Sequence, residues 1–283
     1  MGSKASDELT IRVMRADELA MAVDWAAEES WNPGLADAQC FASVDPDGFL
    51  IGELDGKPVA VVSAVNYDDS FAFLGFFIVR PELRGHSYGI QISQAALAHA
   101  GARTMGIDGV VEQQDNYAKS GFKRAFNNIR YGGVPAGMRA KSTTVPLSQV
   151  PFDSIVADDA RVFPVSRPAF WKAWLGAPGH VGRALLRDGN LAAWGVIRPC
   201  RTGRKIGPLV ADDREAAEAV FAALVGEEGG EVFLDVPQPT NAAVALATEH
   251  GLKPVFETAR MYSGPARPIA LERVYGVTTF ELG

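Results

Sequence analysis

Residues 76–90 read FFIVRPELRGHSYGI, and this stretch decides the fold. An apolar run ends at Arg80-Pro81, which predicts a buried strand that stops there. The loop after it is basic and contains Gly85 and Gly89, and an Ala-rich helix is expected over 88–100. Unpaired N–H groups at a helix N-terminus, with the helix dipole behind them, favour a negative charge. The stretch therefore predicts an anion site suited to a pyrophosphate.

Two common phosphate-binding motifs do not fit this loop. No Gly-Lys-Ser/Thr follows it, which excludes a Walker loop. The glycine spacing also differs from that of a dinucleotide fingerprint. The strands expected before the loop, at Phe49–Leu54, 59–66 and Phe71–Val79, are joined by short turns that favour antiparallel pairing.

The same order of elements occurs twice along the chain. In the first set, a strand at 9–15 and helices at 17–30 and 36–44 come before the three strands named above. After the loop and its helix follow a strand at 106–111, a helix at 116–120 and a strand at 123–131. The second set has strands at 181–187, 191–198, 204–210, 232–236, 253–262 and 274–282, and helices at 213–225 and 241–250. We expect a first domain over 1–133, a linker over 134–151 rich in Gly and Pro, and a second domain over 152–283.

Four residues recur at one common offset and support a divergent tandem repeat. Each set lies where a helix gives way to a strand. The residues are Gly121, Lys123, Phe126 and Arg130 in the first set, and Gly251, Lys253, Phe256 and Arg260 in the second.

The composition is that of a folded globular protein. Hydrophobic residues make up 47% and charged residues 22% of the 283 positions, with 27 Lys+Arg against 34 Asp+Glu. An acidic chain without a basic block matches neither nucleic acid nor an anionic membrane, and no apolar run approaches the roughly 18 residues that span a bilayer. Cys40 and Cys200 lie far apart, so neither a disulfide framework nor a metal site is indicated, and a reduced cytoplasmic location is expected.

The loop resembles the acetyl-CoA loop of the GNAT superfamily of N-acetyltransferases. The family pattern is Arg/Gln-x-x-Gly-x-Gly/Ala after a strand that ends in Val-x-Pro, and here 84–89 read RGHSYG after 79–81, VRP. A Tyr-x-x-x-Gly-Phe sequence follows at 117–122. Ser87 departs from the pattern, because the family usually has Gly there. A positive φ at this position would strain a serine, whereas a negative φ would tolerate it. The resemblance implies an α/β fold with a mixed sheet and two GNAT-like domains in tandem, the second degenerate.

The resemblance also implies the residues that bind acetyl-CoA, with no metal. Tyr117 matches the family's general acid, which protonates the departing thiolate, although it could also be an ordinary amphipathic helix residue. A backbone N–H near Ile78 would hold the thioester oxygen. His86 and Tyr88 also fit exposed loop side chains. The expected cofactor-binding residues are Phe77, Ile78, Val79, Arg84, Gly85, His86, Ser87, Tyr88, Gly89, Ile90, Asn116 and Ser120.

The acceptor side is expected around five further residues. Trp31 and Asn32 lie between the first two helices, where an aromatic wall would attract an amine through cation–π contact or would simply pack. Arg130 and Tyr131 end a strand, and Arg130 either binds an acidic substrate group or forms a structural pair, as Arg260 would. Glu53 is the candidate for the general base.

The second half lacks these features. Its equivalent of the loop, 207–213, reads GPLVADD, and two carboxylates there would repel a pyrophosphate. Ala247 stands in the place of Tyr117. A helix carrying Phe170, Trp171 and Trp174 either closes the acceptor pocket or forms a core between the domains.

These features predict an N-acetyltransferase that moves an acetyl group from acetyl-CoA to an amine of a small molecule, or of a protein, by direct attack in a ternary complex. The absence of a cysteine near the loop agrees with direct attack. The alternative is a non-catalytic acyl-CoA sensor or interaction protein. The protein is expected to be a monomer or homodimer.

Overall fold

The computed structural model describes residues 8–136, 143–226 and 229–283. Its strands are β1 (Thr10–Val13), β2 (Phe49–Leu54), β3 (Lys57–Asn66), β4 (Phe71–Val79), β5 (Thr104–Val110), β6 (Lys123–Gly133), β7 (Val145–Pro146), β8 (Val181–Arg187), β9 (Asn190–Pro199), β10 (Arg204–Ala211), β11 (Val232–Pro237), β12 (Lys253–Tyr262) and β13 (Val274–Gly276). Its α-helices are α1 (Leu19–Glu28), α2 (Asp37–Ala42), α3 (Tyr88–Ala100), α4 (Gln114–Lys119), α5 (Phe152–Val162), α6 (Pro168–Gly176), α7 (Arg214–Val225) and α8 (Asn241–Glu249).

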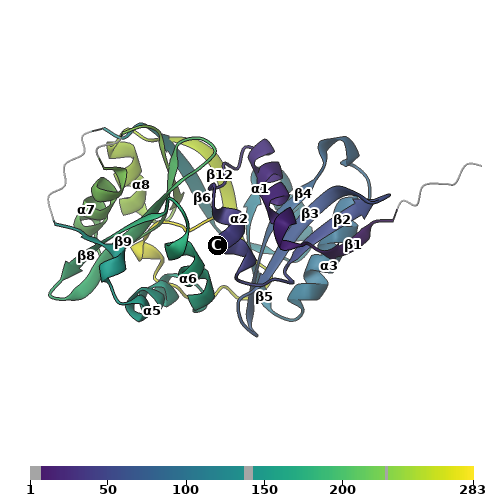
Figure 1. The fold of residues 1–283 in the computed structure, drawn as a ribbon, viewed down its shortest axis with the longest axis horizontal. Helices are drawn as coiled ribbons and strands as arrows, with labels where there is room; N and C mark the ends of the chain where they lie inside the picture. The colour runs from purple at the N-terminus through teal and green to yellow at the C-terminus, as the bar shows by residue number, and fades with distance from the viewer. Residues whose placement is uncertain (1–7, 137–142, 227–228) are drawn as a thin grey trace, which may run out of the picture.

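All described strands belong to one mixed sheet, which runs through both halves of the molecule (Figure 1). Its order is β1-β2-β3-β4-β5-β12-β6-β11-β10-β9-β8-β7, with β13 beside β10. The pairs β4–β5 and β10–β11 are parallel, and the remaining pairs are antiparallel. The predicted α/β fold with a mixed sheet is confirmed.

The two repeats exchange one strand each. β12, from the second half, lies between β5 and β6 of the first, while β6 lies between β12 and β11 of the second. In the β6–β12 pair, Phe126 is opposite Arg260 and Arg130 is opposite Phe256, so the repeated residues meet crosswise. The repeats therefore share a continuous sheet. The boundaries at 133/134 and 151/152 stay a prediction, and positions 1–7 and 137–142 of those ranges lie outside the described residues.

Strong local patterns produced the expected elements. The strands Phe49–Leu54 and Phe71–Val79 and the helix Tyr88–Ala100 have the expected bounds. The helix buries Tyr88, Ile92, Ala96 and Ala100 at four-residue spacing, so one face packs on β2, β3 and β4. Gly101 ends the helix with φ of 64°.

Two elements of the second half differ from the expectation. α5 occupies Phe152–Val162, a segment that the sequence analysis left without an element although it is amphipathic. The strand expected at 274–282 was wrong, because β13 ends at Gly276. The segment 277–283, which we call the tail segment, continues as buried irregular chain instead. Val277 and Phe280 pack in a cluster of second-half residues, and Leu282 joins the core between the halves, so no ladder of strands buries them.

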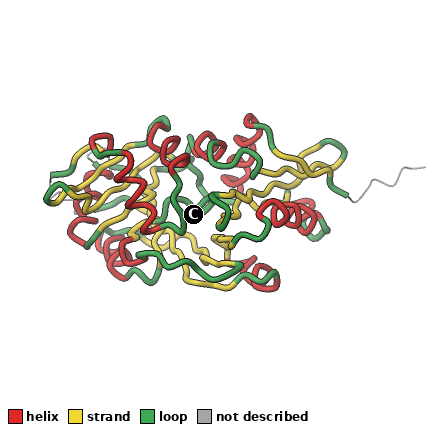
Figure 2. Tube along the Cα trace, turned by 90° about the horizontal axis from the view of Figure 1, so that it is seen from below, coloured by secondary structure: helices red, strands yellow, loops and turns green. Residues whose placement is uncertain are grey.

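The largest core lies between the two halves. Phe41 of α2 stacks on Trp174 of α6, with ring centroids 6.5 Å apart, and Leu282 of the tail segment joins the same cluster. The helix with Phe170, Trp171 and Trp174 was expected either to close the acceptor pocket or to form a core between the domains. In the structure it forms part of the core between the halves. Two perpendicular views place the end of the tail segment at the middle of the molecule (Figures 1 and 2). No helix in the described part of the chain is long and apolar enough to cross a membrane.

Candidate active site

The candidate site is the opening where β4 and β5 separate. The two strands pair only from Phe71 to Leu74 and from Thr104 to Ile107, although β4 continues to Val79 and β5 to Val110. Phe76 has a φ of 49°, and the register between β3 and β4 shifts nearby. In the described residues no strand pairs with the β5 side of β4 beyond Leu74. The edge of β4 from Phe77 to Val79 therefore has no strand partner along the opening, and the Val79 carbonyl there accepts a hydrogen bond from Arg84 Nε.

The loop between β4 and α3 has the geometry of an anion cradle. Gly85 has a φ of 86° and open space where a Cβ would stand. Within the described chain, no hydrogen bond engages the backbone N–H groups of Gly85, His86 and Ser87. These groups lead directly into the thirteen-residue helix α3, whose dipole favours an anion. The loop therefore fits an anion such as a phosphate or diphosphate group.

The unusual serine does not strain the loop. Ser87 has φ of −73° and ψ of −2°, which any L-residue adopts, so the alternative with a positive φ is excluded. Its Oγ accepts a hydrogen bond of 2.9 Å from Gln91 Nε2. Gly89, in the first turn of α3, rests against Phe77 and Val79, which keeps the helix close to β4.

The basic side chains of the loop are tied to α1. Arg84 donates from Nε to the Val79 carbonyl at 2.9 Å and forms an ion pair with Glu29. Arg80 pairs with Glu28 at 2.8 Å and lies 5.1 Å from the ring centroid of Trp25. Arg84 is thus positioned beside the cradle. The ring of Trp25 is therefore in contact with Arg80.

The remaining loop residues divide into exposed and buried side chains. The rings of His86 and Tyr88 stack at 5.5 Å, but the Tyr88 side chain is buried under α3 while His86 is exposed. Ile90 is also exposed, on the outer side of the first turn. The buried side chain of Tyr88 therefore cannot contact a ligand at the cradle, and only its backbone can.

Tyr117 lies over β5, just beyond the residues of β5 that pair with β4. A Cβ added at Gly109 would be 2.9 Å from a Tyr117 ring carbon, so glycine makes room for the ring. The ring also packs edge-on against Phe122, with centroids 6.2 Å apart. Burial raises the pKa of Tyr117 to about 12, and none of the described residues hydrogen-bonds its hydroxyl. Tyr117 is therefore a protonated phenol at neutral pH, as a proton donor must be.

Asn116 and Ser120 bond within their own short helix. Asn116 Nδ2 donates to Gln113 Oε1 at 2.9 Å, and Ser120 Oγ donates to the Asn116 carbonyl at 3.1 Å. Both side chains are exposed beside Tyr117.

Three of the expected acceptor residues lie where the halves meet. The Trp31 carbonyl accepts from Arg130 Nη1 at 2.6 Å and from Lys205 Nζ at 3.4 Å. The Asn32 side chain exchanges two hydrogen bonds with the backbone of Thr202. Arg130 itself forms a buried pair with Asp235, so its structural role is the one that the geometry supports.

Glu53 and Tyr131 are not brought to the opening. Glu53 lies on β2, with β3 between it and β4, and is held by Arg12 at 2.6 Å. Tyr131 is buried in the core of the second half.

Sequence reasoning missed a buried carboxylate, Glu281. Its side chain is 2% exposed and lies near Arg198 and Lys205. Arg198 and Lys205 lie in largely apolar strands, which is a sequence signal of a polar site there.

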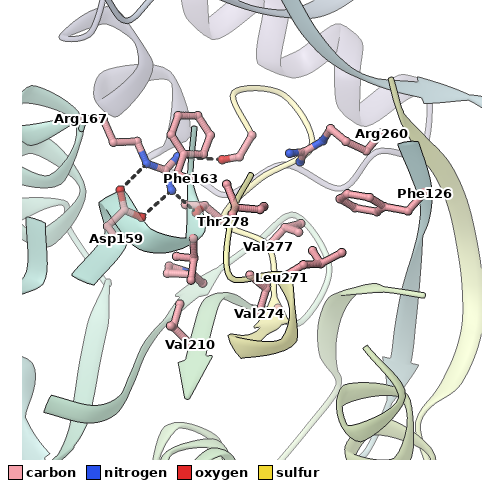
Figure 3. Close-up of a pocket in the computed structure, with 15 residues that line it drawn as sticks. Phe126, Asp159, Phe163, Arg167, Val210, Arg260, Leu271, Val274, Val277 and Thr278 are labelled. Carbon is pink, nitrogen blue, oxygen red and sulfur yellow. Dashed lines mark hydrogen bonds and ion pairs between the residues drawn. The ribbon is translucent and has the colours of Figure 1, made fainter. Parts of the chain in front are cut away.

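A small cavity opens beside the tail segment (Figure 3). Its volume is about 30 Å³, which is room for about two water molecules. Arg167, which lines the cavity, already has partners for its guanidinium. It pairs with Asp159 at 2.8 Å and donates to Thr278 Oγ1 at 2.7 Å and to the Gly283 carbonyl at 2.8 Å. The cavity is too small to hold a substrate, and every guanidinium nitrogen of Arg167 in its wall already has a partner.

The second half has a different helix start at the equivalent place. Asp213 caps α7 by accepting from the Ala216 backbone N–H at 2.9 Å, and it pairs with Arg187. Ala247, in the place of Tyr117, is buried. A carboxylate therefore occupies the position where the first half has free N–H groups. The inability of this half to bind CoA stays a prediction.

The comparisons with known proteins agree with this geometry. Residues 12–122 match the acetyltransferase (GNAT) family, and residues 155–276 match an acetyltransferase (GNAT) domain. The holothin acyltransferase of Pseudoalteromonas sp. (strain SANK 73390) is 30% identical over 271 residues, which cover 94% of this chain and 92% of that protein.

Two solved structures share the fold over nearly the whole chain. A putative acetyltransferase from Pyrococcus horikoshii has a TM-score of 0.83 at 20% identity, covering 100% of this chain and 98% of that one. A tandem GNAT protein from the clavulanic acid biosynthesis pathway has a TM-score of 0.63 at 15% identity, covering 92% and 100%. The chain therefore belongs to the GNAT acetyltransferase family, with two GNAT domains, and is an acyltransferase.

Proposed function

We propose that the protein transfers an acetyl group from acetyl-CoA to the amine of a small molecule, by direct attack in a ternary complex. The observation that carries this proposal is the opening between β4 and β5, which has the anion cradle at 85–87 on one side and Tyr117 on the other. A protein that only sensed acyl-CoA would need the cradle but would have no use for a protonated phenol beside the opening.

Each part of the opening has a task in this reaction. The N–H groups of Gly85, His86 and Ser87 would hold the diphosphate, and the edge of β4 at Phe77 and Ile78, which has no strand partner, would bind the amide groups of the pantetheine arm. Bound acetyl-CoA supplies an activated acetyl thioester. Tyr117 keeps a proton on its phenolic oxygen for the departing sulfur.

The state of the cysteines supports direct transfer over an acyl-enzyme. Cys40 and Cys200 are both buried. Burial raises the pKa of the Cys40 thiol to about 12 and raises that of Cys200 as well, so neither is a thiolate at neutral pH. A nucleophilic cysteine needs the opposite shift.

A panel of amines tests the proposal. Release of free thiol from acetyl-CoA would be measured with polyamines, amino acid amides, aminoglycosides, a lysine peptide and holothin, since one relative is named for that acceptor. We expect turnover with at least one small amine, and acetylated product by mass spectrometry. Tight binding of acetyl-CoA without turnover of any amine would favour the sensor, and preferred turnover of the peptide would favour a protein acceptor.

A further inference from the structure

The tail segment crosses both halves on one face of the sheet. A Cβ atom at Gly75 of β4 would overlap the backbone carbonyl of Glu281, and one at Gly207 of β10 would overlap that of Thr278. Both strands can accept the tail only because glycine stands at these positions. Gly75 is the first β4 residue beyond Leu74, the last that pairs with β5. Glu281 therefore stands at the point where the active-site opening begins.

Glu281 and Tyr117 lie on opposite faces of this opening. Leu74 packs in one cluster with Tyr117, on the face that carries α4. Side chains alternate along a strand, so Gly75 points to the other face, where the tail segment lies. A donor bound along α3 and Tyr117 and an acceptor approaching past Glu281 would thus meet from the two sides of the sheet. This is the arrangement that a ternary complex needs.

The Glu281 carboxylate lacks a hydrogen-bond partner within the described chain. Its side chain is 2% exposed, and neither oxygen has a partner. Burying a carboxylate in this way is costly unless another group binds it. The charged groups that face it are Lys205 of β10, Asp37 of α2, Arg130 of β6 and Arg198 of β9.

Most of these cations are already bound to other groups. Lys205 Nζ donates to the carbonyls of Trp31 and Asn32, and Arg130 uses all three nitrogens on Asp235 and Trp31. Arg198 binds Asp37 through Nε and Nη2, while its Nη1 has no partner in the described chain. Both oxygens of the buried carboxylate therefore keep a hydrogen-bonding capacity that the described chain does not use.

We propose that Glu281 binds the amino group of the acceptor and takes the proton that its nitrogen loses on attack. The inference rests on the proposed function. As the new N–C bond forms and the C–S bond breaks, the nitrogen's proton moves to the Glu281 carboxylate and the phenol proton of Tyr117 moves to sulfur. The acceptor class is a primary or secondary amine.

The protonation behaviour of Glu281 suits a base. Burial raises its pKa above the usual range, and this effect exceeds the opposing one of Lys205 and the two arginines. A carboxylate with a raised pKa accepts a proton from an amine more readily than an exposed one.

The first test replaces Glu281 by glutamine in the full chain. We expect Glu281→Gln to lower kcat/KM by about 10²–10⁴ for the amine with the highest rate in the panel, with acetyl-CoA affinity within about threefold. The acidic limb of the wild-type pH profile should disappear. Glu281→Asp keeps the carboxylate, so it should restore part of the rate and retain that limb. Glu272→Gln makes the same chemical change at an exposed position and should behave as wild type.

A binding measurement gives a second readout. Calorimetric titration of the same amine into the protein saturated with CoA should show weaker binding for Glu281→Gln than for Glu272→Gln. If Glu281→Gln does not fold, the wild-type pH profile and the aspartate variant still decide: a wild type without an acidic limb, or Glu281→Asp without rate recovery and limb, overturns the inference.

The two proposals fail differently. Wild-type turnover that survives in Glu281→Gln with an unchanged pH profile overturns the role of Glu281 and leaves the acetyltransferase. A wild type that acetylates no amine overturns the proposed function, and the role of Glu281 with it.

Discussion

Arg260 of the second repeat and Asp108 of the first form a buried two-pronged ion pair. Arg260 Nε lies 2.8 Å from Asp108 Oδ1, and Nη2 lies 2.8 Å from Oδ2. Arg130 of the first repeat makes the converse pair with Asp235 of the second, at 2.6 and 2.8 Å. Each arginine belongs to an exchanged strand, so the two pairs hold each repeat to the exchanged strand of the other.

Removing one arginine should destabilise the protein strongly. We expect Arg260→Met to lower the free energy of unfolding by about 3–5 kcal/mol, because Asp108 is left as an uncompensated buried charge. Burial already raises the pKa of Asp108. Denaturant unfolding measures the loss, and Arg187→Met, which breaks an exposed pair with Asp213, should have little effect. Equal stability of the two variants would contradict the buried pair's role.

Removing the phenol should affect chemistry and leave cofactor binding in place. We expect Tyr117→Phe to lower kcat by about 10²–10⁴ with little change in CoA affinity, because only the proton donor is lost. Steady-state kinetics with the best amine and calorimetry with CoA measure the two quantities. Tyr275→Phe, at a buried tyrosine in the second half, is the control. A Tyr117→Phe enzyme with wild-type kcat would show that the tyrosine only packs against Phe122.

Two loop variants should differ because their backbones differ. Gly85 has a positive φ, so alanine there is strained by about 1–2 kcal/mol, and Gly85→Ala should weaken CoA binding about five- to thirtyfold. Ser87 has a negative φ, so Ser87→Gly should change affinity by less than about threefold. CoA titrations of both variants test this, and a Ser87→Gly variant that bound tens of times more tightly would contradict the fit of the serine.

Because of His180, the stability of the protein should decrease as the pH is lowered through the mildly acidic range. Burial, helped by the charge of Arg198, lowers the pKa of His180 to about 4, against 6.5 for an ordinary histidine. Between these values the unfolded chain binds a proton that the folded one does not, so stability is full above pH 6.5 and is lost as pH falls toward 4. The contribution is up to about 3 kcal/mol.

The test compares unfolding at pH 7 and pH 4.5. His180→Gln cannot gain the charge and should lose less stability between the two values than the wild type. The ring of His180 rests edge-on against Trp174 at 4.5 Å, so the variant is compared with itself across pH rather than with wild type at one pH. Parallel losses in both proteins would show that His180 does not titrate in this way.

Local patterns predicted the first half of the molecule well. The loop at 84–89 carries its signals within a few residues: a strand that ends at Pro81, glycines and an apolar helix face. Tyr117 also followed from a short motif. The exchange of β6 and β12 could not be predicted, because the two strands have the same pattern and either could pair with β5.

The acceptor side of the site was harder to predict from the sequence, because it is assembled from distant segments. Glu53 is close to the loop in sequence, yet β3 separates its strand from β4. Glu281 approaches Gly75 from the other end of the chain, through a tail segment whose apolar residues resembled a strand. Periodicity indicates that such residues are buried but not which surface buries them.

The exchanged strands have a consequence for biosynthesis. Because the ribosome makes β12 long after β5, the nascent first half must wait with an open strand edge until nearly all the second half has emerged. Unpaired edges readily join those of other chains, so this interval is when aggregation is most probable. Slow translation of the second half, or a premature stop within it, should therefore burden chaperones more than the same delay in a protein whose domains close one at a time.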